Sequence, residues 1–448
     1  MCSNLRKALV LKHLSVRYAS ICEPKYIPVS GFTEYDIQTT SLGNKMIVSS
    51  AENVGMISRV GIAFRAGPRN ETPDNLGVTH ILRIAAGTST KSSTQFAITR
   101  NIQEAGATLT CSVDREIVSY ILEGTRTGVQ KCLKYLRRVA TEQLFHHWEL
   151  SDNMPRVKLE LATRPPQLRA VDLLHKAAYR SRGLGNSLYI PKHHLGKISS
   201  AKLESYVSAN FVANRAAVVG LGVDHSSLVV FAESLGLQCG CEKNIASPYY
   251  GGEIRSDKGG DYAYIAIAAE GSKLSNPKEA LAFAILQRAY GTGTYIKYTN
   301  ENKSPFAKLL GSCPEANLVT ALNVCYSDTG LFGALITSTS TKAGFFLESV
   351  LSILRSGDVS DCDFERGKIQ LKNSVRFALE NGLNGLEEIT NQSLLIGCVT
   401  TPCQTICAID TITKEDVLAA AKKVACSKLS IASVGTLHCL PFLDEMNC

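Results

Sequence analysis

The sequence predicts an α+β protein built from two homologous domains, each a largely antiparallel sheet covered by helices. Three observations support this fold class. The chain has 448 residues, 45% of them hydrophobic and 20% charged, which is enough apolar sequence for more than one core. Residues 63–88 and 267–292 align without a gap and share seven identities over 26 positions. Each copy has the pattern of a strand followed by a helix, and the elements after it recur in the same order.

The first copy of the repeat predicts a half-buried strand that leads into a helix. Apolar residues alternate with polar ones over residues 59–65, and Gly67 follows them. Pro73 precedes the helix, and Gly87 stands where a C-terminal glycine is expected. In the second copy the same pattern places a strand at 264–268 and a helix from 277 to about 291.

The remaining elements follow in matching order in the two halves. Strand, strand and helix are expected at 107–111, 116–123 and 129–139, and again at 318–325, 330–338 and 345–354. Further helices are expected at 168–180, 199–209, 362–380 and 413–425, and closing strands at 216–222 and 428–434. The predicted organisation is a leader at 1–18, an N-terminal domain at 32–229, a linker at 230–248 and a C-terminal domain at 249–440.

The first 18 residues have the composition of a mitochondrial transit peptide. They hold four Lys or Arg residues and no acid, and Lys12 interrupts the apolar core that a secretory signal would need. Arg17 stands two residues before a predicted cleavage between Tyr18 and Ala19. The alternative is an ordinary basic terminus. Without the leader, 44 basic residues face 40 acidic ones, so the charge gives no reason to expect a nucleic-acid partner.

Cysteine usage and hydropathy exclude other classes of protein. The 15 cysteines are odd in number and contain no C-x-x-C motif, so we expect free thiols in a reducing compartment and no structural zinc. No run of about 18 apolar residues is present, which excludes a transmembrane helix but not peripheral attachment. Phosphate-binding and dinucleotide-binding motifs are absent, and no cofactor is expected.

The helix that begins Leu76-Gly-Val-Thr-His-Ile-Leu, after a strand and a Pro-bearing loop, resembles the pitrilysin/insulinase family, to which the mitochondrial processing peptidase belongs. The resemblance implies a processing-peptidase-like fold, a duplication of LuxS/metallopeptidase-like domains. That family carries H-x-x-E-H on this helix: two His ligands for zinc, and a Glu that acts as general base. A third ligand, a Glu, follows some 75 residues later.

In this chain the motif is degenerate. The first ligand position is His80, the position of the general base is Arg83, and the second ligand position is Ile84. Glu160 lies at about the spacing of the third ligand. Arg83 cannot accept a proton from water, and its charge opposes a cation. We therefore predict no catalytic residues and no metal site, and we expect His80 to be a buried, hydrogen-bonded histidine.

Four strings resemble, within this family, the non-catalytic core subunits of ubiquinol–cytochrome c reductase, respiratory complex III. They are residues 185–189, 249–255, 326–333 and 441–445. The resemblance implies a subunit needed for assembly and stability of the complex, peripheral to the mitochondrial inner membrane on its matrix side. Its implied partners are core protein 1, cytochrome b, cytochrome c1 and other subunits of the complex.

Two alternatives remain within the family. One is the non-catalytic α subunit of the processing peptidase, which carries a long glycine-rich loop. The corresponding segment here, residues 291–303, has only two glycines, which argues against it. The other is an active zinc peptidase, which the residues at 83 and 84 oppose.

Overall fold

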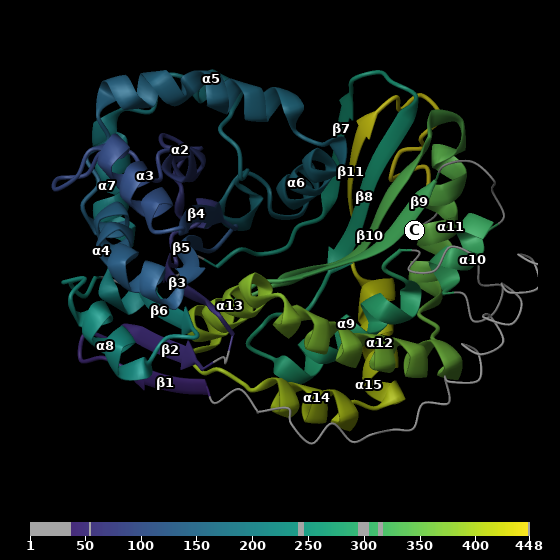
Figure 1. Cartoon of the computed structure of the whole chain (residues 1–448). Helices are drawn as coiled ribbons and strands as arrows, with labels where there is room; N and C mark the ends of the chain where they lie inside the picture. The colour runs from purple at the N-terminus through teal and green to yellow at the C-terminus, as the bar shows by residue number, and fades with distance from the viewer. Residues whose placement is uncertain (1–36, 53–54, 241–245, 294–303, 312–316, 447–448) are drawn as a thin grey trace, which may run out of the picture. The chain divides into compact units, whose positions relative to one another are not determined.

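The computed structural model describes residues 37–52, 55–240, 246–293, 304–311 and 317–446 (Figure 1). All of them fall within one compact unit of the chain. The predicted leader, the cleavage position at Tyr18 and Ala19, and most of the segment 291–303 lie outside the described residues. No helix in the described part is long and apolar enough to cross a membrane.

The first half of the chain forms a mixed sheet of six strands. Antiparallel pairing joins all neighbours except β2 and β6, which are parallel. In spatial order the strands are β1 (Ile37–Ser41), β2 (Ile47–Ala51), β6 (Ala216–Leu221), β3 (Ile57–Phe64), β5 (Val118–Thr125) and β4 (Thr108–Val113).

The second half repeats this pattern in a sheet of five strands. Its one parallel pair is β7 with β11, in the position that β2 and β6 hold in the first sheet. In spatial order the strands are β7 (Gly252–Asp257), β11 (Ser430–Gly435), β8 (Tyr262–Glu270), β10 (Gly330–Thr339) and β9 (Leu318–Cys325). The predicted fold class, a duplicated α+β domain with largely antiparallel sheets, is confirmed.

Helices connect and cover the strands in both halves (Figure 1). In the first half they are α2 (Val78–Ile84), α3 (Gln95–Glu104), α4 (Arg126–Thr141), α5 (His147–Thr163), α6 (Pro166–Tyr179), α7 (Ser200–Asn210) and α8 (His225–Glu233). In the second half they are α9 (Pro277–Tyr290), α10 (Pro305–Gly311), α11 (Ala343–Ser356), α12 (Asp361–Glu380), α13 (Gly382–Asn391), α14 (Pro402–Thr411) and α15 (Lys414–Cys426). The four helices predicted outside the repeat lie within two residues of α6, α7, α12 and α15.

Local sequence explains where several helices begin. The hydroxyls of Thr125 and Ser360 accept hydrogen bonds from the first turns of α4 and α12, and Thr413 forms a capping box with Asp416 at α15. Helix α8 continues to Glu233, and the side chain of Phe231 packs in the first core. The predicted linker at 230–248 therefore overlaps the end of a packed helix.

Each half sends one helix across to the sheet of the other half. Helix α6 of the first half packs Leu174 and Ala178 against Ala266 and Ala432 of the second sheet. Helix α13 of the second half packs Leu386 and its neighbours against β5 and β6 of the first sheet. Both sheets are therefore covered on two faces.

The prediction of a half-buried strand in the first copy of the repeat is wrong, because α13 covers the second face of β3. In β3 the residues between Val60, Ile62 and Phe64 are buried too: Ala63 is 1% exposed, and Gly61 faces Leu386 of α13. The alternating pattern suggested one solvated face, because the sequence does not reveal a covering helix that lies more than 300 residues further along the chain.

Candidate functional site

The start of α2 is fixed by a buried carboxylate. Glu71 accepts hydrogen bonds from the backbone N–H of Gly77 (2.8 Å), from that of Thr79 (2.9 Å) and from the Thr79 hydroxyl (2.7 Å). Burial raises the pKa of Glu71 to about 7, although these hydrogen bonds oppose the shift. Gly77 has φ 90°, and a Cβ there would lie 2.6 Å from Ile190. These contacts set the orientation of the helix that carries His80.

His80 is a neutral, fully packed hydrogen-bond donor. Its side chain is 1% exposed, and its Nδ1 accepts a hydrogen bond from the backbone N–H of Ile190 at 3.3 Å. The proton therefore resides on Nε2, which lies 3.1 Å from Oε2 of Glu160. Burial lowers the pKa of His80; the attraction of Glu160 opposes that shift, and the charge of Arg83 adds to it.

Arg83 and Glu160 complete the cluster. The Arg83 guanidinium donates to the same Oε2 of Glu160 that faces His80, and Arg156 lies 3.6 Å from the other carboxylate oxygen. Partial burial would raise the pKa of Glu160, but the hydrogen bonds from His80 and Arg83 outweigh it, and the pKa is lowered. Ile84 lies in the first core, 3% exposed. The structure thus brings Glu160 to α2, which spacing in the sequence had only suggested.

This cluster does not fit the zinc that the fold family implies. A catalytic zinc site needs three protein ligands and an open position. Here the Glu160 carboxylate and the His80 ring face each other, and the Arg83 guanidinium pairs with the carboxylate in place of a metal cation. Among the described residues, no group of three or more His, Cys, Asp and Glu side chains is arranged to hold a metal. Glu160 neutralises Arg83, so the arrangement is an internal ion pair.

The other histidine and cysteine candidates also form structural contacts. His146 and His147 pack against Trp148, with ring centroids 4.3 and 4.9 Å away. His194 contacts the carbonyl of Leu76 through Nδ1. The ten cysteines in the described part of the chain are free thiols.

The string 326–333 joins the two halves. The Tyr326 hydroxyl donates to Nε2 of His175 in α6 at 2.8 Å. Arg69, from the first half, donates to Glu116 at 2.6 Å and to Oδ1 of Asp328 at 2.9 Å. Glu116 in turn accepts the backbone N–H and hydroxyl of Ser327. The segment 326–333 therefore links the two halves through polar contacts and is not a catalytic motif. We call the contacts among Arg69, Glu116, Ser327 and Asp328 the clamp.

The other strings have similar roles. Asn186 donates to the carbonyls of Pro68 and Glu71, and Ser187 donates to Asp172, which also pairs with the buried Arg115. Near the C-terminus, the Arg255 guanidinium stacks on the ring of Phe442 with 3.6 Å to its centroid. The residues that carry the family resemblance therefore hold the fold together.

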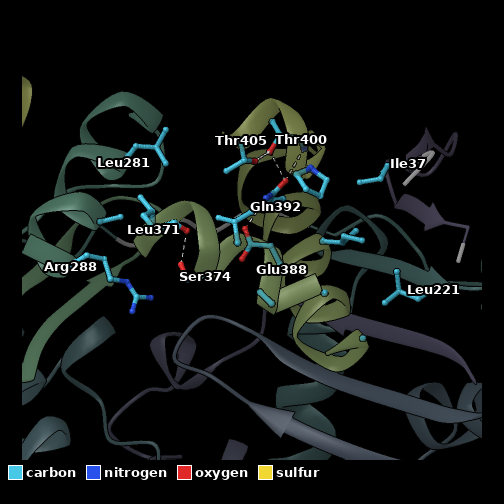
Figure 2. A pocket seen from close by; sticks show the side chains of 17 residues that line it. Ile37, Leu221, Leu281, Arg288, Leu371, Ser374, Glu388, Gln392, Thr400 and Thr405 are labelled. Atoms are coloured by element: carbon cyan, nitrogen blue, oxygen red, sulfur yellow. Dashed lines mark hydrogen bonds between the residues drawn. The ribbon is translucent and has the colours of Figure 1, made fainter. Parts of the chain in front are cut away.

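A separate cavity of about 450 Å³ lies among α9, α12, α13 and α14 (Figure 2). Its lining is mainly apolar, with Arg288 and Glu388 as the charged residues. In Figure 2, Gln392 lies close to Glu388 and Thr400; its amide N–H donates to the Glu388 carboxylate at 2.7 Å, and its carbonyl accepts the Thr400 N–H at 2.8 Å. None of the residues at the α2 cluster lines this cavity.

The chain is similar to M16 family models and to proteins of complex III. The insulinase (peptidase family M16) model matches residues 46–192, and the peptidase M16 inactive domain matches residues 197–371. The chain is 34% identical to human cytochrome b-c1 complex subunit 2, over 92% of each chain, and 35% identical to the mouse protein with the same coverage. It is 27% identical to the α subunit of the mitochondrial-processing peptidase of Solanum tuberosum, over 92% of this chain and 84% of that one. A chain of complex III2 from Candida albicans with Inz-5 bound shares the fold, with TM-score 0.81, 20% identity and coverage of 91% and 98%.

The duplicated fold and the replaced ligands define an M16-type protein without the metallopeptidase motif. The chain belongs to the insulinase-type M16 family and, within it, to the family of the cytochrome b-c1 complex subunit 2. The resemblance to core protein 2 of complex III that the four strings suggested is confirmed.

Proposed function

We propose that this chain is a non-catalytic core subunit of respiratory complex III, needed for assembly and stability of the complex and thereby for electron transfer from ubiquinol to cytochrome c. The observation that carries the proposal is the ion pair of Arg83 with Glu160. It replaces the general base of the family motif with a cation and engages the carboxylate that would otherwise be free for a metal. The fold is kept while the peptidase chemistry is lost.

The proposed partners follow from membership in the family of the cytochrome b-c1 complex subunit 2. We propose that the chain binds core protein 1, cytochrome b, cytochrome c1 and other subunits of the complex, as a peripheral protein on the matrix side of the inner membrane. The acid-free basic leader supports import and cleavage between Tyr18 and Ala19. At the degenerate positions, His80 and Arg83 bind Glu160, and Ile84 packs in the first core. The N-terminal domain at 32–229 and C-terminal domain at 249–440 serve as one structural unit, because α6 and α13 cross between them.

The α subunit of the processing peptidase is the second candidate. Its relatives match at lower identity than subunit 2 of the cytochrome complex does, 27% against 34–35%. The segment 291–303 supports the first candidate, because it lacks the run of glycines expected of that subunit.

Depletion of the chain followed by rescue tests the proposal. Depletion should lower the amount of assembled complex III on native gels together with the partner core subunit, and leave haem spectra of the remaining complexes unchanged. Rescue with the unchanged chain and with Glu160→Gln should both restore the complex, because neither needs a catalytic carboxylate. A normal amount of complex III after depletion would instead favour the processing-peptidase subunit. Failure of Glu160→Gln to rescue, despite normal folding, would point to retained chemistry.

A further inference from the structure

The cavity of about 450 Å³ among α9, α12, α13 and α14 lies between two apolar cores of the protein (Figure 2). From the core of the second half, Leu371 of α12 lines the cavity, and so does Leu281 of α9, which packs against that core. From the cluster that joins α13 to the first sheet, Leu221 of β6 and Ile389 of α13 line it. The cavity is therefore a gap between the core of the second half and the cluster beneath α13.

The polar side chains in the lining of this cavity make hydrogen bonds within the protein. They are Arg288, Ser374, Glu388, Gln392, Thr400 and Thr405. In Figure 2, for example, the Ser374 hydroxyl donates to the carbonyl of Leu371 at 2.7 Å. A buried water needs about two to four polar partners, and cavities that do not offer them take apolar molecules instead. Because the polar groups here already bind one another, the interior of the cavity favours an apolar ligand.

The size of the cavity makes an unfilled state unfavourable. Protein interiors are packed as densely as organic crystals, and unfilled apolar space lowers stability in proportion to its volume. Water against the apolar walls is unfavourable as well. A volume of about 450 Å³ lies within the range of roughly 300–1,000 Å³ that is typical of small-molecule sites. An apolar ligand that fills this space would supply the missing contacts.

The cavity opens to solvent at Glu388 and Thr400, which line it and are exposed. A second cavity of about 490 Å³ shares these two residues, and its lining adds the carboxylate of Asp114. Carboxylates at this opening repel an anionic head group. Inside the first cavity, Arg288 and Glu388 contribute one charge of each sign, so its interior favours neither an anion nor a cation. An uncharged chain therefore fits this cavity best.

We propose that this cavity binds the uncharged hydrocarbon tail of a neutral lipid, with the polar end of the lipid at the opening beside Glu388 and Thr400. The tail lies among α9, α12 and α13 and fills the gap between the two cores. Because α13 also covers the first sheet, the bound lipid stabilises the contact between the two halves. The inference goes beyond the proposed function and does not depend on it, because it uses only the residues that line the cavity.

Alcohols of increasing length test the proposal on the unchanged full chain. Octanol, decanol and dodecanol should each bind as one molecule per chain in calorimetric titrations, and the affinity should rise about fourfold with each added methylene, because each methylene is buried in the cavity. Affinity that does not depend on the length of the alcohol would overturn the proposal. Tighter binding of dodecanoate than of dodecanol would place an anion beside Arg288 and overturn the assignment of an uncharged ligand.

Two variants that fill the cavity locate the binding site. Ala284 of α9 and Ala378 of α12 line it, so Ala284→Phe and Ala378→Phe each put an aromatic ring in the space of several methylenes. Each variant should weaken dodecanol binding by about 10-fold or more. The matched control is Ala201→Phe at an exposed position of α7, which should bind as the unchanged chain does. Unchanged binding in the folded filling variants, or an equal loss in Ala201→Phe, would overturn the assignment to this cavity.

Photolabelling locates the ligand even if a filling variant does not fold. A dodecanol probe with a diazirine at the end of its chain should label peptides from α9, α12 or α13 of the unchanged chain, and an excess of dodecanol should prevent the labelling. Labelling confined to other segments would overturn the proposal. Dodecanol should also raise the midpoint of thermal unfolding of the unchanged chain, because it binds the folded state. No rise at saturating dodecanol would contradict binding in the cavity.

Discussion

His80 donates its Nε2 proton toward Oε2 of Glu160, 3.1 Å away, across 80 residues of sequence. In a metallopeptidase the corresponding atoms would both point at zinc. Here they face each other, and Arg83 contributes the positive charge that the metal would otherwise supply. The arginine at position 83 of α2 thus both replaces the general base and neutralises the carboxylate of Glu160.

Restoring the motif should restore metal binding only when the arginine is removed. We expect the purified chain, and the variant Ile84→His, to contain far less than one zinc per chain. The double variant Arg83→Glu, Ile84→His should bind zinc, because it frees Glu160 and supplies a second histidine one helical turn from the first. Metal analysis after dialysis measures this. About one zinc in the unchanged chain would contradict the assignment.

The clamp between the halves should contribute strongly to stability. Arg69→Met leaves the buried Glu116 with its hydrogen bonds from Ser327 but without its positively charged partner, which should lower the free energy of unfolding by about 3 kcal/mol. The control is Lys414→Met, which breaks an exposed pair with Asp361 and should cost less than about 1 kcal/mol. Urea unfolding of both variants measures the difference. Similar losses of stability in the two variants would contradict the prediction that the buried pair contributes more than the exposed one.

The halves should not fold apart. Each sheet would lose the helix that covers its second face, so fragments 19–240 and 246–448 made separately should be insoluble or poorly folded, and made together should form a complex. Leu386→Ala should destabilise the whole chain by about 2–5 kcal/mol, because Leu386 is fully buried against the first sheet. The exposed Leu159→Ala serves as its control. A single fragment with a cooperative unfolding transition would contradict this expectation.

His175 should make stability depend on pH. Burial, followed by the charge of Arg115, lowers its pKa to about 3 from the ordinary value of 6.5. The unfolded chain therefore takes up a proton below pH 6.5 that the folded chain refuses, and stability falls as the pH drops from 6.5 toward 3. Between pH 7.5 and 5.5 the loss from this group is about 1.4 kcal/mol.

Comparison of the unchanged chain with the variant His175→Gln isolates the contribution of His175 to the pH dependence of stability. His175→Gln cannot titrate, so its free energy of unfolding should fall less over the same interval. His193→Gln, at an exposed position, should keep the slope of the unchanged chain. Glu71 has the opposite shift and offsets part of the total slope, so the measurement is the difference between variants. Equal slopes for His175→Gln and the unchanged chain would rule out His175 as the source.

The mature protein should begin at Ala19. The leader is basic and free of acid, and Arg17 stands two residues before the predicted cut. N-terminal sequencing of the protein from mitochondria checks it. A chain that begins at Met1 would contradict both the cleavage and the import route.

Local pattern was sufficient for much of the fold and for the loss of the motif. The 3.6-residue and two-residue periods located α6, α7, α12, α15 and the closing strands, because those periods follow from backbone geometry. The residues at positions 80, 83 and 84 lie on one short helix, so their incompatibility with zinc could be seen in the sequence. By contrast, the strands β1, β2 and β7 and the helices α3, α5, α8, α10, α13 and α14 were not predicted.

The sequence by itself determined the duplication, the order of the strands and helices that recur in both halves, and the arginine at the position of the general base on α2. Only the tertiary structure decided which residues meet across long separations: Glu160 with Arg83, Arg69 with Asp328, and Leu386 with the first sheet. The physical reason is the range of the forces involved. Helix and strand patterns arise between residues a few positions apart, whereas ion pairs and apolar contacts form between any side chains that the packed chain brings together, and many folds are compatible with one local pattern.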